Sequence, residues 1–205
     1  MKPGTRIGIV ATLGVGVFLS TAIAGGIVGS KHDFSLQSWA DSEICKPCHT
    51  PHNADISIDD APLWNHELTN ATYQLYTSPT LIEQVDQPGP SSRLCMSCHD
   101  GTVAMDSFGG AAGTHYMTGE ALIGTDLRND HPVGIRWRHQ TGSLDCISCH
   151  DVSSGGDLFS SELPFYDAKV ECATCHEPHN SQSIDGMLRM SNNASRLCLY
   201  CHNPT

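Results

Sequence analysis

All ten cysteines of this 205-residue chain occur in five copies of the pattern C-x-x-C-H. In each copy two thiols are three positions apart and a histidine directly follows the second thiol. The cysteines are Cys45, Cys48, Cys95, Cys98, Cys146, Cys149, Cys172, Cys175, Cys198 and Cys201, and the histidines are His49, His99, His150, His176 and His202. Two such thiols can add to the vinyl groups of a porphyrin, and the adjacent histidine can then bind its iron. The pattern therefore predicts five covalently attached haems of the c type.

Two other kinds of site also use the C-x-x-C pattern. A zinc site takes two such units for each metal ion, and a redox-active dithiol takes one. Five units cannot be divided into zinc-binding pairs, and neither chemistry requires a histidine after the second cysteine. Because the histidine is present five times in five, haem attachment is strongly favoured.

Seven histidines remain outside the five motifs, and five six-coordinate irons would need five further axial ligands. His52 and His179 each follow a motif histidine by three residues, within a repeated Pro-His-Asn. This spacing is too short for both histidines to bind one iron from opposite faces, so each is expected to bind a neighbouring haem. His131 is the next candidate, with Asp130 able to orient its ring. The further candidates are His66 and His32, then His139 and His115 as the weaker pair. The surplus of histidine disfavours methionine as a sixth ligand.

The N-terminus has the features of a signal peptide. Lys2 and Arg6 precede an apolar run that reaches Ile23, and Ala22-Ile23-Ala24 has the small-x-small form of a cleavage site. We therefore predict a signal peptide over residues 1–24 and an exported mature protein without a membrane span. An uncleaved anchor over residues 7–28 and a later cut after Ser30 are the alternatives.

The composition of the mature chain predicts an unusual core. Leu, Ile, Val and Phe make up about 18 per cent of residues 25–205, and loss of Lys2 and Arg6 changes the formal charge from −11 to −13. Such a composition would normally indicate disorder. Here the haems can supply the missing apolar core. The predicted fold is one domain of mostly irregular chain with short helices, wrapped around stacked haems. The acidic charge argues against nucleic acid as a partner.

The motifs belong to a longer repeat. Residues 45–53 and 172–180 both read C-x-x-C-H-x-P-H-N, and residues 92–99 and 195–202 both read S-R-L-C-x-x-C-H. The third motif, beginning at Cys146, fits neither unit. Frequent Gly, Pro, Ser, Asn and Asp between the motifs predict turns and no strand ladder. Short helices are expected at the motifs, a helix or an extended run within residues 68–81, and a loop over 101–124.

The repeat resembles the doubled-CXXCH cytochromes, and more closely the subunits of extracellular cytochrome nanowires of the OmcE type. The similar segments are residues 29–33, 45–53, 61–66, 72–76, 94–101, 130–133 and 172–180. The resemblance implies bis-histidine haems in alternating parallel and T-shaped pairs. It also implies a homopolymer in which one subunit supplies an axial histidine to its neighbour, with His32 the best candidate. OmcE-type subunits carry four haems, so the motif beginning at Cys146 is a departure.

Three functions are compatible with these residues. The favoured one is electron transfer along an extracellular filament of this subunit, with redox partner proteins or extracellular acceptors at its ends. The second is a soluble shuttle in the periplasm or at the cell surface. The third is a reductase of a small nitrogen or sulfur oxide, which needs an iron with an exchangeable position. The surplus of histidines argues against an open position, so we expect no enzymatic activity.

Overall fold

The computed structural model describes residues 26–58, 60–136 and 163–202. The predicted signal peptide, the third motif (Cys146, Cys149 and His150) and His139 lie outside the described residues. Within these ranges no helix is long and apolar enough to cross a membrane.

The described chain is mostly irregular, as predicted. Its helices and strands are η1 (Phe34–Leu36), α1 (Pro90–His99), η2 (Gly119–Ala121), β1 (Ile135–Arg136), β2 (Lys169–Val170), α2 (Cys172–Cys175), η4 (Asp185–Met187), η5 (Asn193–Ser195) and α3 (Arg196–Cys201). Three of the elements, α1, α2 and α3, carry cysteines of the second, fourth and fifth motifs. The helix α1 starts with Pro90, whose fixed φ and missing N–H suit a first helical position.

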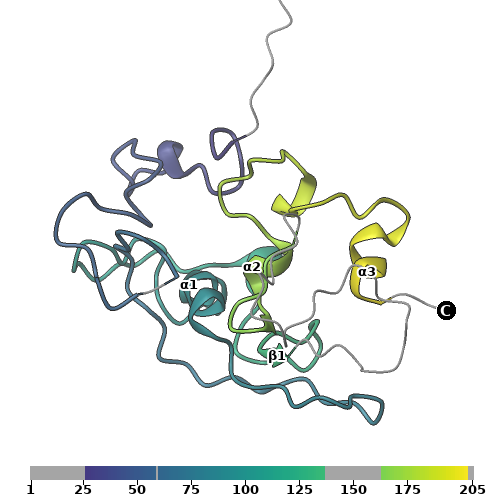
Figure 1. The fold of residues 1–205 in the computed structure, drawn as a ribbon. Helices are drawn as coiled ribbons and strands as arrows, with labels where there is room; N and C mark the ends of the chain where they lie inside the picture. Colours follow the sequence, from purple (N-terminus) through teal and green to yellow (C-terminus); the bar gives the residue numbers. More distant parts are fainter. Residues whose placement is uncertain (1–25, 59, 137–162, 203–205) are drawn as a thin grey trace, which may run out of the picture.

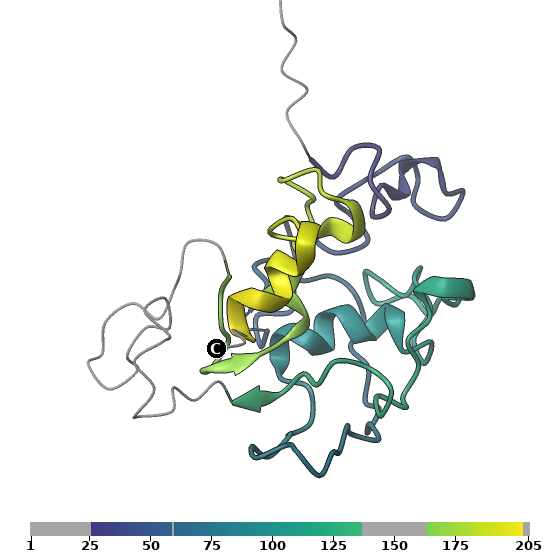
Figure 2. The same cartoon turned by 90° about the vertical axis from the view of Figure 1, so that its right-hand side faces the viewer.

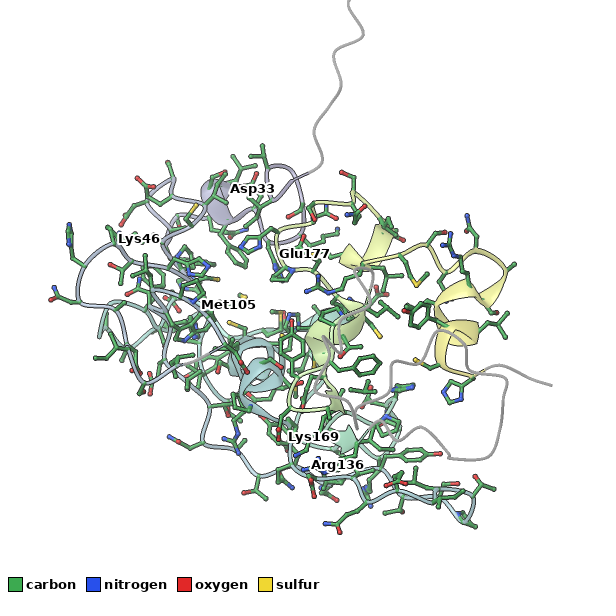
Figure 3. All side chains as sticks on the ribbon, in the orientation of Figure 1. Asp33, Lys46, Met105, Arg136, Lys169 and Glu177 are labelled. Atoms are coloured by element: carbon green, nitrogen blue, oxygen red, sulfur yellow. The ribbon has the colours of Figure 1, made fainter. Side chains whose placement is uncertain are left out.

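The expectation of no strand ladder was wrong in one place. β1 and β2 form a two-stranded antiparallel sheet in which Ile135 pairs with Val170 and Arg136 with Lys169. Each strand has only two residues, so neither shows the alternation by which a strand is recognised in a sequence. Figure 3 shows Arg136 and Lys169 close together at this sheet.

The segment around Tyr73 is extended, which was one of the two conformations expected within residues 68–81. Gln74 forms an isolated parallel bridge with Asp126, and its backbone groups bond to Thr125 and Leu127 at 2.9 Å. This arrangement places Tyr73 against Met96 of α1 and Leu127. These three side chains form a buried cluster with Ala71, Leu75 and Val133 packed around it. The apolar core among residues 26–58, 60–136 and 163–202 is therefore small, as the composition predicted.

The N-terminal segment of the described chain lies against the segment that follows α2. In Figure 1 the segment before residue 50 lies beside the segment that follows α2, and Figure 2 shows the same neighbours from the side. Figure 3 labels Asp33 on the first of these segments and Glu177 on the second. The His32 ring joins these segments, because its Nδ1 lies 3.2 Å from the carbonyl oxygen of Pro178. Helices α1 and α2 also lie against each other.

Candidate haem-binding sites

One helical turn brings the reactive groups of each described motif to the same side. In the first, fourth and fifth motifs the histidine N–H donates to the carbonyl of the first cysteine, over 2.8 Å for His49, 3.0 Å for His176 and 2.8 Å for His202. The second motif lies within α1. The first motif has this turn without a longer helix. Local backbone structure thus presents two thiols and one imidazole together, which is the arrangement needed to attach a haem.

The motif histidines are oriented by backbone carbonyls. The Nδ1 atoms of His49, His99 and His176 lie 2.8, 2.7 and 2.7 Å from the carbonyl oxygens of Pro62, Ala121 and Gly186. A carbonyl oxygen only accepts, so Nδ1 must carry the proton and donate it. The Nε2 lone pair then remains available to bind iron. No sequence signal marks these carbonyls, which come from segments 10 to 22 residues further along the chain.

Three motif histidines each face a second imidazole at the same distance. The ring centroids are 6.2 Å apart for His49 and His179, for His99 and His32, and for His202 and His131. Two imidazoles that bind one metal from opposite sides, through bonds of about 2.0 Å, have centroids roughly 6 Å apart. The three pairs therefore have the spacing of bis-histidine iron sites. Their interplanar angles differ, at 17°, 45° and 72°.

Hydrogen bonds also hold the rings of these distal histidines. The Nδ1 of His179 lies 3.0 Å from Oε1 of Glu177, a residue not singled out from the sequence although the Glu-Pro-His spacing was visible. Burial would raise the pKa of Glu177, but hydrogen bonds from Ser181 and His179 hold it at about 2. The carboxylate is thus an acceptor over the whole neutral range. At His131 the expected partner was Asp130, whereas Nδ1 lies 3.0 Å from the carbonyl oxygen of Pro132.

The environment of His32 suits a ligand. Burial lowers the pKa of His32, and the charge of nearby His99 acts in the same direction. Both effects favour the neutral imidazole, which is the form that binds a metal. His32 therefore lies ready for a haem of its own chain, opposite His99.

The remaining candidates lie elsewhere. His66 is buried, with Nε2 3.0 Å from the carbonyl oxygen of Ala104 and 3.5 Å from Sγ of Cys98, and it faces no motif histidine. His52 is exposed and bonds to Thr50 through its backbone. His115 pairs with Asp106 at 2.7 Å. Within the described part of the chain, one motif histidine has no second histidine ring at this distance, and that residue is His176.

The motifs follow one another in space as well as in sequence. Burial raises the pKa of the Cys98 thiol to about 12, and the proximity of Cys48 adds to the effect. Cys95 and Cys172 lie close enough for their thiols to interact. Burial raises the pKa of the Cys175 thiol, and nearby Cys172 and Cys198 add to the effect. The first motif therefore lies near the second, the second near the fourth and the fourth near the fifth.

The donor set fits haem better than zinc. No group of three or more His, Cys, Asp or Glu side chains gathers in the described residues as a metal site. A structural zinc ion needs four protein ligands, whereas haem iron takes its equatorial ligands from the porphyrin and needs axial ones from the protein. Paired imidazoles beside paired thiols meet the second requirement. A haem bound there would supply an iron that exchanges single electrons.

A comparison with known protein families agrees with this chemistry. Residues 165–205, which contain the fourth and fifth motifs, match the family model described as the doubled CXXCH motif. The match supports a multihaem c-type cytochrome. No protein of the curated set matches the chain. The C-x-x-C-H motifs thus indicate covalently bound c-type haem and a role in electron transfer, and the number of five haems remains the prediction made from the sequence.

Proposed function

We propose that this protein carries electrons along a row of bis-histidine haems as the repeating subunit of an extracellular filament. The observation that carries the proposal is the set of three imidazole pairs with centroids 6.2 Å apart. An iron with an imidazole on each face has no free position for a substrate, so it passes electrons without transforming a ligand. We therefore also propose that the protein is not an enzyme.

The proximity of thiols from successive motifs supports electron conduction through the subunit. Thiols of the first and second, the second and fourth, and the fourth and fifth motifs lie near one another, so haems attached to them would also be neighbours within one subunit. A long filament requires that this series continue into the next copy. A heterologous contact that does not close produces such an open polymer.

We propose a different joint from the one expected from the sequence. His32 was the expected ligand for a neighbouring subunit, but its ring lies opposite His99 of its own chain. His52 is exposed and His176 faces no described imidazole. We therefore infer that His52 of one copy binds the haem attached beside His176 of the next copy. The repeat supports this, because His179, at the equivalent position, also reaches across to a haem other than its own.

Electron microscopy of the native mature protein, purified from the outside of cells, tests the filament. We expect long thin filaments of this subunit alone, exported by means of the predicted signal peptide. His52→Ala should retain its haems and give discrete particles, whereas His115→Ala, at another exposed histidine, should still polymerise. Discrete particles of the unchanged protein at high concentration would refute the filament and favour a soluble shuttle. Normal filaments of His52→Ala would refute the proposed joint alone.

A further inference from the structure

A buried carboxylate connects the helices that carry the second and fourth motifs. Glu171 directly precedes Cys172, the first residue of α2, and only 2% of Glu171 is exposed to solvent. Both of its carboxylate oxygens lie 3.2 Å from the backbone nitrogen of Gly89, which precedes α1. The Ser92 hydroxyl of α1 donates a further hydrogen bond to Oε2.

Ser92 completes the connection in the opposite direction. Its Oγ accepts a hydrogen bond of 2.9 Å from the backbone nitrogen of Cys172, and its side chain has no exposure to solvent. Glu171, Ser92 and the amides of Gly89 and Cys172 thus form a closed polar cluster, here called the clasp. Ser92 precedes Cys95 by three residues, and the Cys95 and Cys172 thiols lie close to each other. The clasp therefore lies at the junction of two haem-attachment sites.

A larger residue at Gly89 would displace the carboxylate of the clasp. A Cβ atom on Gly89 would lie 2.6 Å from Oε1 of Glu171, which is closer than real Cβ atoms approach. The charge of Lys169 acts on Glu171, but the ion pair of Lys169 is with Asp86, at 3.1 Å. A buried carboxylate without a contacting cation depends on hydrogen bonds to offset its desolvation. The Gly89 N–H and the Ser92 hydroxyl on the α1 side donate to this side chain, and the capping box of α2 adds a bond from the backbone N–H of Thr174.

The internal repeat shows that a motif can fold without the clasp. Ser195 occupies the position equivalent to Ser92 in the second S-R-L-C-x-x-C-H unit, and it is exposed. Ile44 occupies the position equivalent to Glu171 in the first C-x-x-C-H-x-P-H-N unit. Both of these motifs still form their helical turn. The clasp is thus a property of the junction between α1 and α2, where the Cys95 and Cys172 thiols lie close together.

We propose that Glu171 and Ser92 are positioning residues that set the separation of the haems attached at Cys95 and Cys172, and hence the rate of electron transfer between them. This inference rests on the proposed electron-transfer function. The step moves one electron from the reduced site to the oxidised site, and no bond forms or breaks. Rigid hydrogen bonds suit this role because a positioned site must be held by its supporting groups.

The test compares Ser92→Ala and Glu171→Gln with Ser195→Ala in the haem-loaded protein. Ser195→Ala is the matched control, since it makes the same change in the same local sequence. Three measurements are needed: hydrogen exchange at the Gly89 and Cys172 amides, the exciton couplet in Soret circular dichroism, and electron redistribution after partial photoreduction. We expect Ser92→Ala and Glu171→Gln to lose amide protection, to weaken the couplet and to slow redistribution several-fold. Ser195→Ala should match the unchanged protein.

The outcomes separate this inference from the proposed function. If Ser92→Ala and Glu171→Gln lose amide protection but keep the Soret couplet and the rate of electron redistribution, the clasp does not position the haems and the inference is wrong. If these variants also keep amide protection, the clasp does not exist in the haem-loaded protein and the inference is again wrong. If the unchanged protein shows no redistribution, the electron-transfer function fails, and the couplet still decides the positioning role. Ser92→Ala removes only one oxygen atom, so it serves if Glu171→Gln loses haem during assembly.

Discussion

Replacing His179 by alanine should change the spin state of one haem in each chain. The His179 ring faces His49 at 6.2 Å, so its removal leaves the haem attached at Cys45 and Cys48 with one axial imidazole. The pairs of His99 with His32 and of His202 with His131 do not include His179. The expected change is therefore one additional high-spin iron per chain, with the other described sites unchanged.

A milder substitution gives a graded form of the same effect. Glu177 holds the Nδ1 atom of His179 at 3.0 Å. Loss of a group that orients a metal-binding histidine typically lowers metal affinity about 10–100-fold, which corresponds to roughly 1.4–2.7 kcal/mol. We expect Glu177→Gln to keep a low-spin haem at this site but to make its sixth position 10–100 times more accessible to an added ligand, by the same estimate.

Electron paramagnetic resonance of the ferric protein, integrated against total haem, measures the spin state. Carbon monoxide binding to the reduced protein measures the accessibility of the sixth position. His115→Ala is the control, because His115 pairs with Asp106 and not with a motif histidine. The pairing of His49 with His179 would be refuted if His179→Ala kept every iron low-spin, or if His115→Ala produced the same high-spin signal.

The other predictions concern stability, each followed by urea unfolding of the haem-loaded protein. Tyr73→Phe should cost about 1.5–3 kcal/mol, since the buried phenol donates a 2.7 Å hydrogen bond to the carboxylate of Asp100; an unchanged midpoint would contradict this bond. Hydrogen bonds from Arg128 hold the pKa of Asp126 at about 2, below its ordinary 3.8, so its small stabilising effect should be constant above pH 4 and disappear as the pH falls towards 2. Comparison with Asp126→Asn measures it, and a difference that does not diminish between pH 4 and pH 2 would contradict the assignment. Gly134→Ala should cost more than the roughly 1–2 kcal/mol of a left-handed residue, because φ is +74° and the new Cβ would lie 2.5 Å from a backbone oxygen; a smaller cost would contradict the clash.

Several local features could be predicted from residues close together in the chain. The helical turns at the motifs follow from the short spacing of C-x-x-C-H, and three of them do lie in α1, α2 and α3. The irregular character of the chain follows from its frequent turn residues and small supply of apolar side chains. The β1–β2 ladder could not be predicted, because pairing of Ile135 with Val170 joins segments too short to show a pattern.

The ligand pairs illustrate a different limit. The repeat indicated that His179 serves a haem other than its own, but the sequence does not say which one. The structure places it opposite His49, more than a hundred residues earlier. The resemblance implied that His32 binds a haem of a neighbouring subunit; in this structure its Nδ1 lies 3.2 Å from the Pro178 carbonyl oxygen and its ring faces His99. Such contacts depend on where distant segments pack.

The sequence by itself determined the covalent attachment of haem at C-x-x-C-H and the net negative charge, and it predicted imidazole as the prevailing iron ligand. These properties depend on residue types and on spacings of a few positions, which bond geometry converts directly into local structure. Only the tertiary structure decided which imidazoles face each other, which motifs are neighbours in space, and the burial of Glu171 between α1 and α2. The physical reason is that these contacts join segments up to 130 residues apart, as for His49 and His179, and packing brings such segments together where local preference cannot.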